Sequence, residues 1–352
     1  MELRQLGEWG LIHRIQTSFT SPKRSNVVLG LGDDAAVIRI SSGKSLLLTT
    51  DLLVEGVDFE LPLCSYKQIG YKALAVNLSD IAAMGGLPRY FLVSLAIPSR
   101  TPVSSVDQLY RGMQGLAKQF KVALIGGDTS SSPQGFFLNL VVAGETEPSR
   151  LVRRAGARVG DQIFVTGTLG DSRAGLEILK SQAAGRKMRT NTKMAGKRSA
   201  RSRPLTMLIR RHLYPMPRVR EGRLLATKGV ASAMMDLSDG LASDLRRLCE
   251  ASRVGALIDT ALLPISPSLS RYAGLKARGP SEYALKGGED FELLFTVSPS
   301  RIARLIELQQ GGQMKATRIG VIRPQREGIS LIAQNGEKKK LNAQGYEHFR
   351  SK

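Results

Sequence analysis

The stretch KQIGYKALAVNLSDIAAM, Lys67–Met84, gives the clearest indication of the fold. Its apolar residues recur every three to four positions, which predicts a helix with one buried face. Gly85–Gly86 ends that helix, and Pro88 prevents it from restarting. Short apolar runs on both sides, KSLLLTTD at Lys44–Asp51 and the segment Tyr90–Ile97, predict strands. The local order is therefore strand, helix, strand.

The same alternation continues along the chain, and a polar stretch at Glu145–Arg158 divides it into two halves. In the first half we also expect a strand, a turn and a strand over 27–40, a helix at 105–120, and strands at 122–125 and 136–143. In the second half we expect strands at 162–167 and 232–236, helices at 171–182, 205–213 and 241–252, and a strand, a helix and a strand after Phe291. This order predicts the α/β (α+β) class, with two α/β sandwich domains at 1–147 and 148–352.

The chain of 352 residues is strongly basic, with 51 Lys and Arg against 30 Asp and Glu and a formal net charge of +21. Eight of the basic residues lie in RKMRTNTKMAGKRSARSR, Arg186–Arg203, which contains no acid. We interpret 183–204 as a basic, flexible insertion in the second domain. It lacks interleaved aromatic residues and helical periodicity, so it does not favour nucleic acid as a partner.

The cysteine count and the hydropathy indicate the compartment. Two cysteines, Cys64 and Cys249, are too few for a disulfide framework or a four-sulfur zinc site. The N-terminal MELRQLGEWGLIHRI has no long apolar core followed by small residues, so we do not expect a signal peptide. No apolar run reaches the length of a membrane span. We expect a cytoplasmic protein with no membrane partner.

Two glycine-containing patterns resemble phosphate-binding loops and fail in detail. Gly30–Ala35, GLGDDA, fits the dinucleotide pattern, but its two Asp residues would repel a bare phosphate and a strand follows it. Gly43–Ser45 resembles the end of a P-loop, but Ile38 stands where the first glycine belongs and no helix follows. Neither pattern predicts a nucleotide site of the usual kind.

The acidic residues form a more informative pattern, because they recur beside Gly, Ser or Thr at predicted ends of elements. They are Asp33-Asp34, Asp51, Asp80, Asp128, Asp236, Asp239 and Glu289-Asp290. Each motif alone is compatible with an Asx turn or a helix cap. The three histidines have no metal-ligand spacing, so a converging set of oxygen donors favours a hard cation such as Mg²⁺ over zinc. Carboxylates around Mg²⁺, without a P-loop, indicate phosphate chemistry.

Eight motifs carry a resemblance to a known family. In chain order they are GLGDDAAV, LTTDLLVEGVDF, YKALAVNLSDIAAMG, LIGGDTS, VTGTLGDSRAGL, MDLSDGLASDL, LKGGEDFELLFTV and GYEHF. They resemble the thiamine-monophosphate kinase family, within the aminoimidazole ribonucleotide synthetase superfamily, over the whole chain except about 183–204. The resemblance implies a homodimer in which two N-terminal sheets pair. It also implies a C-terminal α/β domain that covers the nucleotide.

The resemblance implies that ATP phosphorylates thiamine monophosphate to thiamine diphosphate, with several Mg²⁺ ions bound. It assigns the metal sites to Asp34, Thr49, Thr50, Asp51, Asp80, Asp128, Asp236 and Asp239. It assigns the ATP site to Tyr110, Gly127, Asp128, Arg154 and Ser238. It assigns the thiamine-phosphate site to Asp58, Glu289 and Tyr346. Position 58 is Asp where many relatives carry His, and the insertion has no counterpart that the motifs identify.

The motifs contain no general base, and the expected chemistry requires none. The acceptor is a phosphate oxygen that is already anionic at neutral pH, so Mg²⁺ and Arg154 are expected to bring two polyanions together. Tyr346 offers an aromatic face and Glu289 a negative charge for a cationic thiazolium. Two alternatives stay open: another ATP-dependent enzyme of the superfamily, and a basic nucleic-acid-binding protein.

Overall fold

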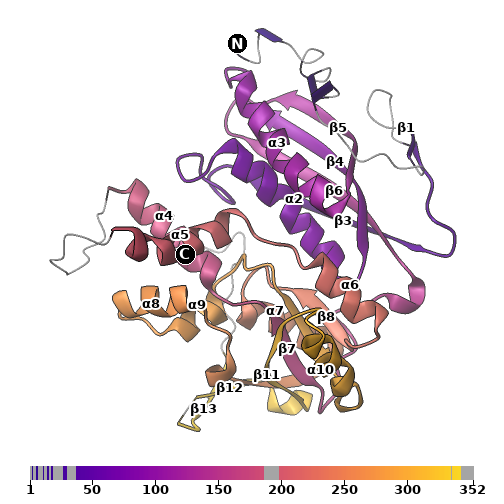
Figure 1. Ribbon diagram of the computed structural model, residues 1–352, viewed down its shortest axis with the longest axis vertical. Helices are drawn as coiled ribbons and strands as arrows, with labels where there is room; N and C mark the ends of the chain where they lie inside the picture. The colour runs from indigo at the N-terminus through magenta and orange to yellow at the C-terminus, as the bar shows by residue number, and fades with distance from the viewer. Residues whose placement is uncertain are drawn as a thin grey trace. The chain divides into compact units, whose positions relative to one another are not determined.

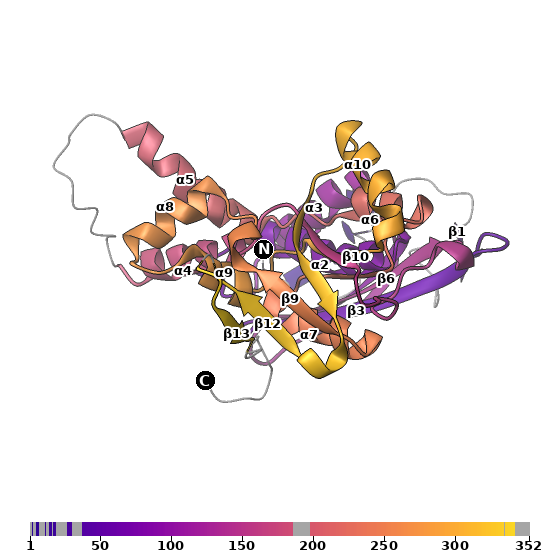
Figure 2. The same cartoon turned by 90° about the horizontal axis from the view of Figure 1, so that it is seen from below.

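A computed structural model describes residues 2, 5–6, 11, 14–15, 17–18, 27–29, 37–185, 198–333 and 335–341. The chain divides into two compact units, the first being Met1–Ile81 with Gly86–Ser149 and the second Ala82–Gly85 with Arg150–Lys352. Each unit combines a β-sheet with helices (Figures 1 and 2), which confirms the mixed α/β class. The strands β1 (Val27–Leu29) and β2 (Val37–Ile38) pair antiparallel, as the sequence predicts for residues 27–40.

A four-stranded sheet forms the body of the first unit. In sheet order its strands are β3 (Ser45–Val54), β6 (Phe137–Thr146), β4 (Leu87–Ile97) and β5 (Ala123–Ser131). β6 pairs antiparallel with both β3 and β4, whereas β5 pairs parallel with β4. The helices α2 (Tyr66–Ala83) and α3 (Val103–Phe120) lie across the sheet (Figure 1). The strands β3 and β5 are therefore the two edges of this sheet.

Glycines allow α2 and α3 to cross in close contact. A Cβ atom at Gly70 would lie 2.0 Å from the carbonyl oxygen of Leu109, and one at Gly112 would lie 2.0 Å from that of Lys67. Any larger residue at either crossing position would push the two helices apart. The close crossing fixes the position of α2, which carries Asp80.

Three strands of the first unit extend beyond their predicted ends, and one of them is β6, which runs to Thr146 rather than to residue 143. We expected β3 to end at Asp51 and β5 at Ile125, but they run to Val54 and Ser131. The extra residues of β3 and β5 are hydrogen-bonded to a neighbouring strand. β3 pairs with β6 over its whole length, and β5 pairs with β4 as far as Ser131. Asp51 and Asp128 therefore lie inside strands rather than at strand ends.

The second unit is built on a seven-stranded sheet in the order β13-β12-β9-β11-β7-β10-β8. The strands are β7 (Gln162–Thr166), β8 (Ala233–Asp236), β9 (Gly255–Asp259), β10 (Leu293–Val297), β11 (Ala316–Arg323), β12 (Ile329–Ile332) and β13 (Lys338–Lys340). The helices are α4 (Asp171–Ala183), α5 (Arg198–Leu213), α6 (Val219–Thr227), α7 (Leu241–Ser252), α8 (Pro267–Leu275), α9 (Pro280–Lys286) and α10 (Ile302–Gln310). Residues from β7, β8, β10 and α7 pack into one apolar core.

The predicted helix at 205–213 begins earlier than expected. α5 starts at Arg198 and contains Pro204, which the sequence analysis placed just before the helix. The preceding Arg and Ala residues are good helix formers, which is consistent with the extra turns. α6, α8, α9, β9, β12 and β13 were not predicted. No helix in the described part of the chain is long and apolar enough to cross a membrane.

Candidate active site

Three adjacent strands of the second unit bring three loops to one edge of its sheet. β10 lies between β7 and β8 and runs antiparallel to both, with Leu293 opposite Asp236 and Leu294 opposite Val165. The carboxyl ends of β7 and β8 therefore lie beside the amino end of β10. The loops at this edge carry the motifs TGTLGD, DLSDG and GGEDFE.

Backbone hydrogen bonds join the second and third of these loops. The amide of Glu289 donates to the carbonyl oxygen of Ser238 over 2.7 Å, and the amide of Phe291 donates to that of Leu237 over 2.9 Å. The amide of Leu237 in turn donates to the carbonyl oxygen of Glu292 over 2.8 Å. Ser238, expected at the ATP site, and Glu289, expected at the thiamine-phosphate site, are therefore held side by side. Asp236 ends the strand that leads into the same loop.

Asp239 lies close to Asp244, an acidic residue that the sequence analysis did not single out. The buried carboxylate of Asp244 accepts hydrogen bonds from the backbone amides of Asp239 and Gly240, each over 3.1 Å. Arg247 bridges the two acids, at 2.5 Å from Asp239 and 3.1 Å from Asp244. Burial, together with the charge of Asp239, raises the pKa of Asp244 to about 7. The sequence DLSDGLASD indicated this acid only as part of a helix start.

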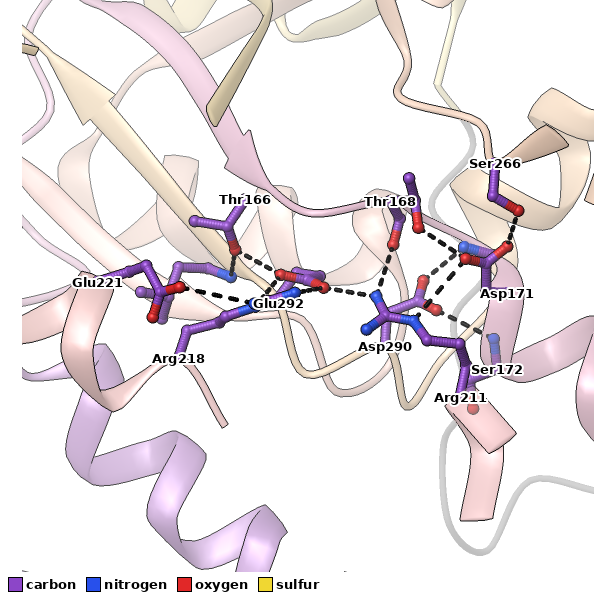
Figure 3. A network of polar contacts seen from close by, with 12 residues as sticks. Thr166, Thr168, Asp171, Ser172, Arg211, Arg218, Glu221, Ser266, Asp290 and Glu292 are labelled. Atoms are coloured by element: carbon purple, nitrogen blue, oxygen red, sulfur yellow. Dashed lines mark hydrogen bonds and ion pairs between the residues drawn. The ribbon is translucent and has the colours of Figure 1, made fainter. Parts of the chain in front are cut away.

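An ion-pair network around the fully buried Glu292 adjoins these loops (Figure 3). The carboxylate of Glu292 accepts hydrogen bonds from Arg211, from Thr166 and, through two nitrogen atoms, from Arg218, all over 2.6 Å. Burial raises the pKa of Glu292, but the hydrogen bonds and charges of Arg218 and Arg211 outweigh it, so the pKa lies below its ordinary value. Glu292 is thus a buried carboxylate that stays ionised.

Arg211 connects this network to the amino end of α4 (Figure 3). Its Nε atom lies 3.8 Å from Asp171, which also accepts hydrogen bonds from Thr168 and Ser266 over 2.6 Å each. Asp290 accepts from the backbone amides of Gly170 and Ser172. Burial raises the pKa of Asp290 to about 8, although those two hydrogen bonds oppose the shift. Asp290 therefore anchors its loop to α4 and lies away from solvent.

In the first unit, β3 and α2 bring predicted metal-site residues together. The hydroxyl of Thr49 donates to the carboxylate of Asp80. Burial, with the charges of Asp80 and Asp58, raises the pKa of Asp51 to about 7. Asp58 itself accepts a hydrogen bond from the backbone amide of Val54 over 2.8 Å. Three carboxylates from two motifs, LTTDLLVEGVDF and YKALAVNLSDIAAMG, therefore lie near one another.

Asp128 does not belong to that group within one copy of the chain. In register, Asp51 shares a row with Leu140, Val93 and Gly127, while Asp128 lies in the next row with Ser94, Asn139 and Leu52. Successive side chains point to opposite faces of a sheet, so Asp128 faces away from the side that holds Asp51 and Asp80. Three strand spacings also separate the two acids by roughly 14 Å. One ion cannot be bound by both from the same sheet.

The remaining candidate residues have varied surroundings. The hydroxyl of Thr50 donates to the side chain of Asn139 over 2.9 Å. Tyr110 is buried in α3, and burial raises the pKa of its phenol. A Cβ atom at Gly127 would lie 2.1 Å from the carbonyl oxygen of Val93, so glycine is required for the pairing of β4 and β5. Arg154 is exposed. Asp34 and Tyr346 lie outside the described residues.

The described donor set fits Mg²⁺ in its chemistry. Within the described ranges, no three Asp, Glu, His or Cys side chains form a group that could hold a metal ion. The candidate donors are oxygen atoms, which suit a hard cation. The crowding of Asp51 by Asp80 and Asp58, which raises its pKa, is what a bound cation would relieve.

Comparison with known proteins identifies the class. Residues 32–146 match the N-terminal domain of AIR synthase related proteins, and residues 158–332 match the C-terminal domain. The chain therefore belongs to the AIR synthase related family.

Relatives that match over nearly the whole chain show to which branch of the AIR synthase related family the chain belongs. The chain is 38% identical to the thiamine-monophosphate kinase of Bacillus subtilis, over 98% of this chain and 100% of that protein. A crystal structure of thiamine-monophosphate kinase from Stenotrophomonas maltophilia has a TM-score of 0.77 and 34% identity, over 93% of this chain and 96% of that one. AaThiL complexed with AMPPCP and TMP has a TM-score of 0.74 and 37% identity, over 99% of each chain. Within the family, the chain belongs with the thiamine-monophosphate kinases.

Proposed function

We propose that this protein transfers the γ-phosphoryl group of ATP to thiamine monophosphate, giving thiamine diphosphate and ADP. The observation that carries the proposal is the full-length match to thiamine-monophosphate kinases, one of them solved with AMPPCP and TMP. The backbone hydrogen bond between Glu289 and Ser238 supports the proposal. Ser238 is expected to contact ATP and Glu289 to contact thiamine monophosphate, and the two residues lie side by side.

The residues suit a direct transfer between two bound substrates. A phosphate oxygen of thiamine monophosphate attacks the γ-phosphorus, the bond to the β-phosphate oxygen breaks, and ADP leaves. That acceptor oxygen is anionic, so no side chain has to remove a proton from it. Glu289, one-third exposed at the loop surface, offers its negative charge to the cationic thiazolium. Arg154 is exposed and offers its charge to the ATP phosphates.

We propose that Asp34, Thr49, Asp51 and Asp80 bind Mg²⁺ in the first unit and that Asp236 and Asp239 bind it in the second. The side chain of Thr50, predicted for the same site, points to the opposite face of β3 and contacts Asn139, so only its backbone could take part. When bound, Mg²⁺ neutralises the phosphates and the carboxylates that hold it. The raised pKa of Asp51 supports this assignment, because crowded carboxylates favour a cation. The hydroxyl of Thr49 orients Asp80.

We also propose a homodimer in which two first-unit sheets face each other. The sheet face away from Asp51 exposes Leu48 and Leu52, which are 66% and 58% exposed, together with Leu46 and Phe137. An apolar face of this kind on an edge strand is typical of an interface. Leu48→Asp should therefore convert a dimer into a monomer in sedimentation velocity, and Leu275→Asp, 60% exposed in the second unit, should not. A monomeric wild-type protein would contradict this proposal.

Steady-state kinetics test the reaction. We expect Mg²⁺-dependent ADP formation with thiamine monophosphate and none with aminoimidazole ribonucleotide precursors or selenide as acceptor. Initial velocities at varied ATP and thiamine monophosphate should give intersecting reciprocal plots. Parallel plots, with label from γ-labelled ATP retained on the protein, would indicate a phospho-enzyme and refute direct transfer. The absence of turnover with thiamine monophosphate would refute the function. The two free cysteines are compatible with the cytoplasmic location, which stays a prediction.

A further inference from the structure

His212, one of the three histidines without metal-ligand spacing, contacts a residue of the proposed substrate site. It lies at the end of α5 and is 6% exposed. Its Nδ1 atom lies 3.2 Å from Oε2 of Glu289 and 3.1 Å from the hydroxyl oxygen of Ser172. A buried imidazole is therefore within hydrogen-bond distance of a carboxylate that is one-third exposed.

The carboxylate of Glu289 determines which ring nitrogen of His212 carries a hydrogen atom. An ionised Glu289 can only accept hydrogen bonds, so Nδ1 of His212 must carry hydrogen and donate it. The hydroxyl oxygen of Ser172 lies close enough to accept from the same hydrogen. By donating this hydrogen, the imidazole fixes the direction in which the Glu289 carboxylate points.

His212 is held firmly by its neighbours. A Cβ atom at Gly175 of α4 would lie 2.2 Å from the carbonyl oxygen of Leu208 and 3.0 Å from Cβ of His212, so α4 and α5 are in close contact there. The adjacent Arg211 is bound to the buried Glu292 over 2.6 Å (Figure 3). The donor is thus fixed on a packed helix rather than on a loop.

The acceptor is also held in a specific conformation. Glu289 has a φ of 65° and Phe291 a φ of 49°, both in the left-handed region that non-glycine residues rarely adopt. Such conformations persist only where surrounding contacts enforce them, and they concentrate at functional sites. The hydrogen bonds of Glu289 to Ser238 and of Asp290 to Gly170 and Ser172 supply those contacts. The loop therefore presents Glu289 in one orientation.

We propose that His212 is a positioning residue that orients the Glu289 carboxylate toward the cationic ring of the acceptor substrate. This inference rests on the proposed function, because it assumes that Glu289 contacts thiamine monophosphate. His212 does not touch substrate itself. It favours a cationic acceptor by keeping the carboxylate of Glu289 aligned.

A double-mutant cycle tests the inference on the full-length protein. His212→Phe should raise the KM for thiamine monophosphate by roughly tenfold or more, as expected for loss of a hydrogen bond to a charged group, with little change in the KM for ATP. In a Glu289→Gln background, His212→Phe should raise the KM for thiamine monophosphate by less than about twofold, because the two residues act as a unit. His212→Asn, whose amide lies near the place of Nδ1, should restore most of the affinity. Lys286→Ala, an exposed residue on nearby α9, is the control.

The outcomes separate the two proposals. If Glu289→Gln leaves the KM for thiamine monophosphate unchanged, the role of Glu289 fails and the inference about His212 fails with it. If Glu289→Gln raises that KM but His212→Phe does not, the inference alone is overturned. Additive effects of the two changes, or a His212→Asn variant as weak as His212→Phe, would overturn it as well. Circular dichroism at the assay temperature verifies that each variant is folded.

Discussion

Glu292→Gln probes the buried network on which the loops of the second unit rest. The wild-type carboxylate is fully buried and accepts four hydrogen bonds over 2.6 Å, two from Arg218 and one each from Arg211 and Thr166. Glutamine keeps the shape but loses the charge, and its NH₂ group would point a donor at one of the donors that surround it. The substitution therefore leaves two partly buried guanidinium groups without their shared counter-ion.

The expected loss is large for a single substitution. Removing one partner of a buried ion pair costs about 3–5 kcal/mol, because the remaining charge stays desolvated. For a unit of about 150–250 residues each kcal/mol lowers Tm by about 2–4 °C, which gives a decrease of roughly 6–20 °C. The pH dependence has a defined sign. Because the folded-state pKa of Glu292 is lowered, its contribution is complete above the unfolded pKa of about 4.3 and is lost as the pH falls through the folded value.

Thermal unfolding followed by circular dichroism measures this effect at pH 7 and at a series of lower pH values. The matched control is Glu221→Gln, which removes the 3.6 Å contact of the same Arg218 with a partly exposed partner and should cost less than about 1 kcal/mol. A Glu292→Gln variant within 2 °C of wild type at pH 7 would refute the reasoning. So would a difference between the two proteins that grows as the pH falls below 4.

Three further predictions concern the proposed site and the insertion. Asp51→Asn should abolish most ADP formation at saturating Mg²⁺ while leaving the circular dichroism spectrum unchanged, and near-wild-type turnover would exclude a metal role for Asp51. Arg247→Gln should lower Tm in EDTA by about 2–4 °C, because Asp239 and Asp244 lose the cation that they share. Mg²⁺ should then raise the Tm of the variant more than that of wild type. An equal response of the two proteins to Mg²⁺ would contradict the pairing of Arg247 with the two acids. Replacing 186–197 by a short Gly-Ser linker should leave turnover within about tenfold of wild type, and a larger loss would show that the insertion contributes to catalysis.

The first unit shows which features a single sequence can predict. The helical period of α2 and the glycines that follow it are local signals, and the observed helix lies within one residue of the predicted bounds at each end. The ends of β3 and β5 depend on partners far away in sequence. Their extra residues are held by β6 and β4. The separation of Asp51 from Asp128 also depends on sheet order, which no local pattern encodes.

The second unit shows why part of the site was not predicted. Arg211 and Arg218 lie 81 and 74 residues before Glu292, so nothing in the local sequence pairs them. In a chain with 51 basic residues, one more arginine carries little information. His212 was discounted because it has no metal-ligand spacing, yet a positioning donor needs only one acceptor. The available signal was a histidine one residue before the end of the helix predicted at 205–213.

The motif GGEDFE illustrates how conformation assigns different tasks to adjacent acids. In an ordinary strand, residues 290 and 292 would share one face and 289 would point to the other. The left-handed backbone at Glu289 and Phe291 breaks this alternation before β10 begins at Leu293. Asp290 thereby reaches the amides of α4, Glu292 reaches the two arginines, and Glu289 stays at the surface beside His212. The two buried acids fix the loop, and Glu289 is the acid that remains at the surface, where we propose that it meets a cationic substrate.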